Sequence, residues 1–255
     1  MKNLYAQLAT AFGDKTYRIS KEQSLQFNEL SHFVAMKGDH YDVQNCRLMI
    51  IGRAVNGWGS IACPNAKEFG VQAEQVFNGT GFEWVVYDER GLHNTEDKIY
   101  FLSRSPFWRT SQQIWEQLSG VRQDKWVDYI AWSNIYKVAP PTTGNPTTKM
   151  CRTQIELCRQ ILKKEIETYK PTHILFVTGW NWWFQDSKFG VAKLFEQTNF
   201  IKENKRGNTT YAEGTAIYKG VNVDIPVVVA CRPEQRNEQE YVKQVVETFK
   251  KLEEK

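Results

Sequence analysis

Three short stretches of the sequence place glycine, amide or guanidinium groups directly after an apolar run, and such groups could bind a small planar ligand. The first is residues 52–59, GRAVNGWG, whose three glycines let a ligand approach the backbone closely. The others are residues 133–137, SNIYK, and residues 231–235, CRPEQ. The amide of Asn134 carries one acceptor and two donors, so it could read the hydrogen-bonding edge of a pyrimidine.

Each stretch also has an ordinary structural interpretation. Residues 52–59 match neither G-x-x-x-x-G-K-[ST] nor G-x-G-x-x-G, and they could simply form a tight turn from a strand into a helix. An Asn at the end of a strand often caps a turn. Arg232 could pair at the rim of the sheet with a carboxylate such as Glu234 or Glu238. The residue types alone therefore leave binding and structural roles open.

The apolar runs ahead of these stretches predict the strands of a parallel sheet. They lie at about residues 47–51, 129–134, 173–178 and 226–230. Helical patterns separate them, at about residues 66–77, from residue 106 to Gly120, and from Thr148 to Tyr169. Strands that alternate with helices indicate a three-layer α/β/α domain with four parallel strands. Ligands bind such sheets beyond the carboxyl ends of the strands. The sequence places four candidate residues there, Gly52, Asn134, Gly179 and Arg232.

The ends of the chain complete this expected domain. The first 40 or so residues show amphipathic patterns that predict an N-terminal helical extension, with Phe27, Leu30 and Phe33 repeating the pattern of the first helix. A further helix is expected near residues 190–197, and an amphipathic helix closes the chain. No Pro/Gly/Ser-rich linker divides the sequence, so residues 1–255 are expected to form a single domain.

Composition narrows the class of protein. Hydrophobic residues make up 41% and charged residues 24%, which is typical of a globular chain rather than a disordered one. No apolar run reaches the ~18 residues of a membrane span, and the N-terminus lacks the apolar stretch of a secretory signal. We therefore expect a cytoplasmic protein without a membrane partner. The net charge of +4 permits a nucleic-acid partner but does not demand one.

The cysteines predict buried, reduced thiols. There are five, an odd number, scattered at Cys46, Cys63, Cys151, Cys158 and Cys231. They form no C-x-x-C pair, and no His/Cys cluster has the spacing of zinc ligands. We therefore expect no metal site and no cofactor.

Together the three stretches resemble the uracil-DNA glycosylase superfamily. In the bacterial and archaeal members that this chain resembles, a strand ends in Asn, an apolar pair and Lys. After this strand come a proline turn with Gly-Asn, a helix bearing a Cys, and Lys-Pro before an apolar strand that ends in Gly. The matching residues here are Asn134-Ile135-Tyr136-Lys137, Pro140-Pro141, Gly144-Asn145, Cys158, Lys170-Pro171 and Gly179. With the first and fourth strands, the resemblance spans roughly residues 46–235, about three quarters of the chain.

The chain departs from the family pattern at three places. The family's first motif has a water-positioning Asp, Asn or Glu just after the glycine of the first strand, and Asn56 is the candidate, about one residue off the usual spacing. The last motif normally begins His-Pro, where His stabilises the departing base as an anion, and here Arg232 takes the place of that His. Iron–sulfur members carry a Cys directly after the Lys of the second strand. Val138 follows Lys137 here, so no cluster is expected.

The resemblance implies a DNA glycosylase that draws uracil or a related base out of DNA into a pocket and hydrolyses its N-glycosidic bond. The catalysis would be mainly electrostatic, because the base leaves with negative charge and the sugar becomes positive. Asn56 would orient water and Arg232 would donate to the base oxygen. The substrate-binding residues would be Gly52, Trp58, Phe69, Asn134 and Lys137. Among them Asn134 would read the pyrimidine edge, and Trp58 or Phe69 would stack on its face.

Two other functions stay open, because a fold does not determine a function. The chain could be a catalytically impaired nucleic-acid- or nucleotide-binding relative, since its departures fall on the residues of the chemical step. It could also be an unrelated enzyme that acts on a small molecule. A glycosylase would leave alkali-labile abasic sites in a uracil-containing oligonucleotide. A binding protein would retain DNA in a strongly salt-dependent way without product, and a small-molecule enzyme would do neither.

Overall fold

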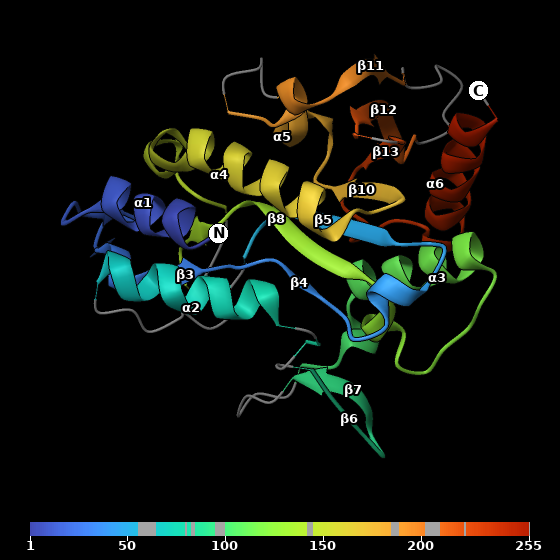
Figure 1. The fold of residues 1–255 in the computed structure, drawn as a ribbon, viewed down its shortest axis with the longest axis horizontal. Coiled ribbons are helices and arrows are strands. Elements are labelled where there is room, and N and C mark those ends of the chain that lie inside the picture. The colour runs from blue at the N-terminus through green and yellow to red at the C-terminus, as the bar shows by residue number, and fades with distance from the viewer. Residues whose placement is uncertain are drawn as a thin grey trace.

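A mixed β-sheet with helices packed around it forms the centre of the molecule (Figure 1). The computed structural model describes residues 1–55, 65–79, 81–82, 85–94, 100–141, 145–184, 189–201, 210–221 and 223–254. Within these residues the main sheet has seven strands in the order β11-β12-β13-β10-β5-β8-β4. The helices are α1 (Lys2–Phe12), α2 (Ala66–Asn78), α3 (Pro106–Ser119), α4 (Thr148–Tyr169), α5 (Trp180–Phe184) and α6 (Glu238–Glu253).

The four central strands of this sheet are the four that the apolar runs predict, and their parallel pairing is confirmed. They are β5 (Leu48–Ala54), β8 (Ala131–Tyr136), β10 (His173–Val177) and β13 (Asp224–Ala230). β5 pairs in parallel with both β8 and β10, and β10 pairs in parallel with β13. Every residue of β8 and of β10 is buried, as expected for parallel strands covered on both faces.

The prediction of a four-stranded sheet is wrong, because antiparallel strands extend both edges. β4 (Met36–Lys37) pairs with β8 at one edge. At the other edge β12 (Ala212–Lys219) pairs with β13, and β11 (Glu196–Phe200) pairs with β12. The sequence does not predict β12, because every second residue in its first half is small, namely Ala212, Gly214 and Ala216, and no bulky apolar run marks the strand.

The predicted N-terminal helical extension is confirmed only for its first helix, α1, and the helix predicted near residues 190–197 is wrong. After α1 the N-terminal region contains β1 (Tyr17–Arg18), β2 (Ser24–Leu25), β3 (Ser31–His32), β4 and two short 3₁₀ turns, η1 (Phe27–Glu29) and η2 (Tyr41–Val43). Residues 190–197 contain only a 3₁₀ turn, η6 (Ala192–Leu194), and the start of β11. In both places the backbone pairs with a distant strand, since β3 pairs with β9 (Val138–Ala139) and β11 with β12.

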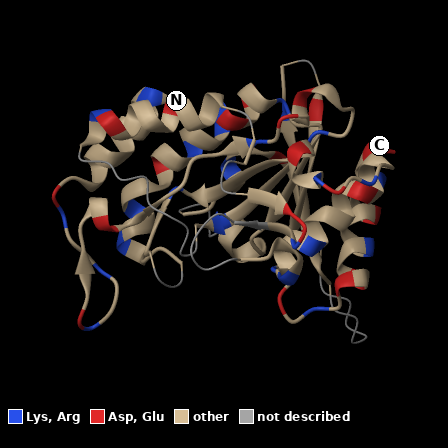
Figure 2. Cartoon of the chain, turned by 90° about the horizontal axis from the view of Figure 1, so that it is seen from below, with Lys and Arg blue, Asp and Glu red and all other residues tan. Residues whose placement is uncertain are grey.

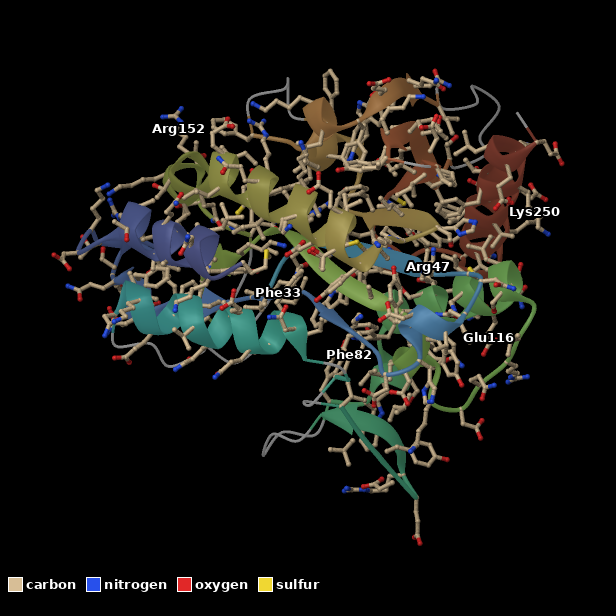
Figure 3. The ribbon with its side chains drawn as sticks, viewed as in Figure 1. Phe33, Arg47, Phe82, Glu116, Arg152 and Lys250 are labelled. Atoms are coloured by element: carbon tan, nitrogen blue, oxygen red, sulfur yellow. The ribbon has the colours of Figure 1, made fainter. Side chains whose placement is uncertain are left out.

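The apolar residues of the N-terminal pattern are nevertheless inside. Phe33 is buried and packs on Trp132 of β8, with ring centroids 4.8 Å apart. Figure 3 shows Phe33 in the interior, whereas Arg152 and Lys250 lie at the surface. The hydrophobic pattern therefore identifies buried residues correctly here, although it assigns them the wrong backbone conformation.

The helices cover both faces of the sheet. Trp132 packs on Trp108 of α3, with ring centroids 5.1 Å apart, while the hydroxyl of the next residue, Ser133, donates to Glu165 of α4 at 2.7 Å. Successive side chains of a strand point to opposite faces, so α3 and α4 lie on opposite faces. Arg109 of α3 forms an ion pair with Glu238 at the start of α6, and α1 packs between α2 and α4.

Capping residues and turn residues set the ends of the long helices. The side chains of Asn65, Thr147 and Asn237 accept hydrogen bonds from backbone N–H groups in the first turns of α2, α4 and α6. Gly120 ends α3 in the left-handed conformation, with φ of 71°. Lys170 ends α4 in the same way, with φ of 48°. The helices predicted from residue 106 to Gly120 and from Thr148 to Tyr169 are therefore confirmed.

The remaining elements are short. They are β6 (Val85–Asp88), β7 (Gly91–Asn94), η3 (Leu102–Arg104) and η4 (Trp126–Tyr129). β6 and β7 pair as an antiparallel hairpin that projects from the body of the molecule (Figure 1).

None of the described helices combines the length and the apolar character that crossing a membrane requires. Four cysteines lie in described residues, and all are buried and free, whereas Cys63 lies outside them. Burial raises the pKa of Cys46 and of Cys158 to about 12, so these thiols are protonated at neutral pH.

A buried ion pair joins β8 to α4. Lys137 and Glu165 are both fully buried, with Lys137 Nζ 2.8 Å from Glu165 Oε1. The same ammonium group donates to Ser133 Oγ and to the carbonyl oxygen of Asn134, each at 2.8 Å. Breaking such a pair from one side leaves a charge buried without its partner, which is strongly destabilising.

We expect Glu165→Gln to lower the free energy of unfolding by about 3–5 kcal/mol, measured by urea denaturation. The matched control is Glu167→Gln on the same helix. Glu167 lies 3.9 Å from Lys163 in an exposed pair, so its loss should cost less than about 1 kcal/mol. A Glu165→Gln variant as stable as the wild type would show that the pair is not a structural contact.

Candidate functional site

A pocket opens at the carboxyl edge of the sheet, beside the point where the strand order reverses. Among the four parallel strands β5 comes first in the sequence. The next, β8, lies on one side of it, and the third, β10, lies on the other side. Ligand sites in open α/β sheets occur at this point. The pocket has a volume of about 200 Å³. A cavity of roughly 150 Å³ holds one benzene ring, so this pocket has room for one single-ring base.

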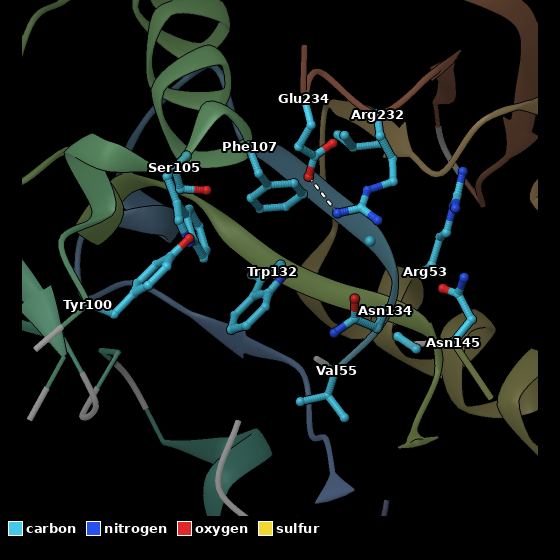
Figure 4. A pocket seen from close by; sticks show the side chains of 14 residues that line it. Arg53, Val55, Tyr100, Ser105, Phe107, Trp132, Asn134, Asn145, Arg232 and Glu234 are labelled. Carbon is cyan, nitrogen blue, oxygen red and sulfur yellow. Dashed lines mark hydrogen bonds and ion pairs between the residues drawn. The ribbon is translucent and has the colours of Figure 1, made fainter. Parts of the chain in front are cut away.

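The pocket is lined by residues from several elements that are distant in sequence (Figure 4). Gly52 to Val55 come from β5 and its end, Trp132 and Asn134 from β8, and Val177 from β10. The other lining residues are Tyr100, Ser105, Phe107, Trp108, Asn145, Arg232 and Glu234. The sheet edge therefore brings together three of the predicted site residues, Gly52, Asn134 and Arg232.

Asn134 is the most deeply buried polar residue among those described in the pocket lining. It is 2% exposed, and its Nδ2 has no hydrogen-bond partner among the described residues. A buried donor without a partner costs about 1–3 kcal/mol, so a ligand that accepts a hydrogen bond there would recover that cost. Gly52 lies opposite Asn134 in the pairing of β5 with β8, and a Cβ at Gly52 would overlap Asn134 Oδ1. The glycine therefore leaves the space that the amide occupies.

Aromatic rings form one side of the pocket. Phe107 and Trp108, at the start of α3, pack edge to face with ring centroids 4.9 Å apart. Trp108 packs in turn on Trp132, and Tyr100 completes the lining. Burial raises the pKa of the Tyr100 phenol, so that group is neutral at physiological pH. The faces of these aromatic rings, beside the buried amide of Asn134, can hold a flat polar ring.

Sequence reasoning assigned none of these aromatic rings to the site. Trp132 had a usable signal, because it lies two residues before Asn134 on a strand and therefore on the same face. Phe107 and Trp108 had none, since only the packing of α3 against β8 brings them to the pocket. Tyr100 likewise comes from a separate part of the chain.

Arg232 lies at the rim of the pocket, where it pairs with Glu234 at 2.5 Å (Figure 4). Its side chain is 48% exposed. The rim ion pair that the sequence left open as an alternative is therefore present. The guanidinium nevertheless lines the same pocket as Asn134, so it can also serve a ligand there.

Arg53 is a second cation at the site, and sequence analysis gave it no role. Its Nε donates to the carbonyl oxygen of Thr178 at 2.6 Å, and its guanidinium lies 5.3 Å from the ring centroid of Trp182. Burial, and next the positive charge of Arg232, lower the pKa of Arg53. A neighbouring anion would relieve the repulsion between these two guanidinium groups.

Two other predicted site residues, Phe69 and Lys137, do not line this pocket. Phe69 is fully buried in α2, where its ring packs edge to face on Tyr5, with centroids 5.6 Å apart. Lys137 binds Glu165 on the opposite side of β8 from Asn134. Asn56 and Trp58 lie outside the described residues, so the water-positioning and stacking roles assigned to them stay predictions.

Charge around the molecule is mixed. Figure 2 shows Lys and Arg interspersed with Asp and Glu rather than gathered over one face. Within the described parts of the chain, no three His, Cys, Asp or Glu side chains form a group that could hold a metal ion.

No protein-family model matches the chain, and no curated protein matches it. The pocket itself offers a buried amide, aromatic rings and two cations.

Proposed function

We propose that the chain is a DNA glycosylase with a uracil-DNA-glycosylase-like fold, which hydrolyses the N-glycosidic bond of uracil or a related base. The observation that carries the proposal is the buried amide of Asn134, with its Nδ2 unpaired among the described residues, in a pocket the size of a single ring. A pyrimidine carries carbonyl oxygens and a ring N–H on one edge, and an Asn amide can pair with both.

The fold supports the same proposal. Gly52 and Asn134 are paired opposite each other near the carboxyl ends of β5 and β8, and Arg232 follows the end of β13 at Ala230. Asn134 and Arg232 come from segments about 100 residues apart in the sequence and still line one pocket. This convergence is what a base-binding site of that superfamily requires.

The proposed reaction uses the pocket as an electrostatic site. The base, drawn out of the DNA strand, would lie beside the rings of Trp132 and Phe107 with its edge toward Asn134. As the glycosidic bond breaks, its electron pair moves to the base, and donation from Asn134 Nδ2 and the charge of Arg232 would stabilise the anion. A water molecule then supplies its oxygen to the sugar carbon and its proton to the base. Asn56 is the proposed residue that orients this water.

A single oligonucleotide assay tests the proposal. Uracil, hypoxanthine or a mismatched thymine is placed in a labelled strand, and alkali cleaves the strand wherever the base has been removed. We expect cleavage at uracil that depends on enzyme concentration and is strongly reduced by Asn134→Leu. Absence of cleavage at every base, with a folded wild-type protein, would overturn the glycosylase proposal.

The second candidate is a DNA- or nucleotide-binding protein without excision. The ion pair between Arg232 and Glu234 favours it, because a neutralised cation stabilises a departing anion less. This candidate predicts retention of DNA that falls steeply with salt and yields no abasic product. The same oligonucleotides, followed by a mobility assay, separate the two functions.

Arg232 and Glu234 should have opposite effects on excision. We expect Arg232→Ala to lower kcat/KM about 10-fold, because a half-exposed and paired guanidinium stabilises the anion less than a buried donor does. Glu234→Gln should raise kcat/KM, since it frees the cation. Arg232→His tests whether the shorter donor of the related enzymes restores or increases the rate. Unchanged excision in Arg232→Ala would leave Arg232 with a rim role alone.

A further inference from the structure

A second, more open cavity of about 520 Å³ adjoins the base pocket. The two cavities share Arg53, Arg232 and Glu234. The second cavity also contains Arg236, which follows Arg232 by four residues in the loop after β13. The two cavities are therefore adjacent.

The cavity carries more positive than negative charge. Three arginines line it, Arg53, Arg232 and Arg236, against two carboxylates, Glu213 and Glu234. Both carboxylates have internal partners, because Glu234 pairs with Arg232 and Glu213 accepts from the backbone N–H of Trp180 at 2.6 Å. The lining suits the phosphates of a nucleic-acid backbone, which is a chain of negative charges.

An exposed group of aromatic rings lies next to the cavity, on α5 and β11. We call Trp180, Phe184 and Phe200 the aromatic cluster. Trp180 stacks on Phe184 with centroids 5.5 Å apart and an interplanar angle of 11°, and its centroid lies 5.1 Å from that of Phe200. Phe184 is 38% exposed and Phe200 is 48% exposed.

Trp180 links this cluster to the cavity and holds its place against the sheet. Its ring lies over Gly214 of β12, where a Cβ would overlap the indole. Trp180 also lines the cavity that contains the arginines. Trp180 is therefore held against the sheet beside the arginines, and the exposed rings of Phe184 and Phe200 pack on it.

We propose that the arginines of the cavity and the aromatic cluster bind single-stranded DNA that flanks the base in the pocket, in preference to duplex DNA. The inference rests on the proposed function for the identity of that base. Exposed aromatic rings stack on unpaired bases, and a positive groove follows the backbone. In a duplex the faces of the bases are covered by their neighbours, so the cluster has nothing to stack on and only the backbone contacts remain.

Binding without any excision tests the inference. The probes are a labelled oligothymidine and a duplex of the same length, both free of uracil, and the dissociation constants are measured by fluorescence anisotropy. We expect the single strand to bind about 5- to 100-fold more tightly, the range that corresponds to loss of one base–aromatic stack. Phe200→Ala should remove most of this difference and leave duplex binding unchanged.

Two further variants make the result specific. Arg236→Gln should lower the slope of log K against log salt for the single strand by about 0.7, the value for one phosphate contact. This readout also serves if Phe200→Ala proves unstable. Tyr87→Ala is the matched control, since Tyr87 is an exposed ring on the β6–β7 hairpin, far from α5 and β11 in Figure 1. It should leave both affinities unchanged.

The outcomes separate this inference from the proposed function. Equal affinity for single strand and duplex would overturn the inference, even in a protein that excises uracil. An undiminished preference in Phe200→Ala together with an unchanged salt slope in Arg236→Gln would also overturn it. The inference would be supported while the glycosylase proposal fails if the protein excises no base but prefers the single strand. In that case Phe200→Ala should reduce the preference and Arg236→Gln should lower the salt slope.

Discussion

Asn134→Leu should lower kcat/KM for uracil excision by about 10²- to 10³-fold, the usual effect of removing one preorganised donor to a developing anion. Leucine has nearly the shape of asparagine but can neither donate nor accept a hydrogen bond. Because the replaced donor is buried and has no partner among the described residues, folding should not suffer. We expect the free energy of unfolding to stay unchanged or to rise. Single-turnover excision and urea denaturation measure the two effects.

The combination of a lower rate with unchanged or greater stability distinguishes a binding residue from a structural one. Ser133→Ala, at the next position of β8, is the matched control. Ser133 faces α4 and donates to Glu165, so its loss should lower stability and leave excision by the folded fraction intact. Excision by Asn134→Leu at the wild-type rate would remove Asn134 from the site.

Gly52→Ala should produce a loss of excision of similar size, about 10²-fold, because the added methyl group displaces the amide of Asn134. The Cβ would occupy the space of Asn134 Oδ1, so the amide must turn away from its position. The flexible side chain can move where backbone could not, and the strand pairing of β5 with β8 should therefore survive. Excision kinetics and circular dichroism of the variant test both parts of this prediction.

A double-mutant cycle decides whether Gly52 acts through Asn134. If it does, Gly52→Ala should cost almost nothing further in an Asn134→Leu background, and the two changes should be strongly non-additive. Additive losses would instead mean that Gly52 provides room for the ligand directly. Gly79→Ala serves as a control, because a Cβ there meets helix carbonyl oxygens of α2 at 3.3–3.4 Å and lies outside the pocket.

Asn134 and Lys137 belong to one predicted motif but have different roles, because their side chains lie on opposite faces of the sheet. Asn134 and Lys137 belong to the same stretch, yet they lie three positions apart, and side chains alternate between faces with a period of two. Asn134 therefore faces the pocket on the side of α3, and Lys137 binds Glu165 and Ser133 on the side of α4. One short stretch of the chain thus contributes a side chain to the pocket and another to the core.

The sequence by itself determined the centre of the fold and the edge where the site lies. Long apolar runs ending in Gly, Asn or Arg predict β5, β8, β10 and β13, because strands covered on both faces must be apolar throughout. Their parallel direction then places Asn134 and Arg232 at one edge. The bounds of α4 were also accessible, since Thr147 can cap its start and Lys170-Pro171 ends it.

Only the tertiary structure decided which side chains meet at that edge. Phe107 and Trp108 reach the pocket through the packing of α3 on Trp132, and Arg53 acquires its position from Thr178 and Trp182. The edge strands form because their backbones pair with other strands, β4 with the distant β8, β11 with β12, and β12 with β13, although their own patterns resemble turns or helices. Hydrophobic periodicity reports local burial, whereas strand pairing and side-chain packing join residues far apart in the chain. The local sequence therefore predicts the strands of the core, and contacts between distant segments assemble the pocket.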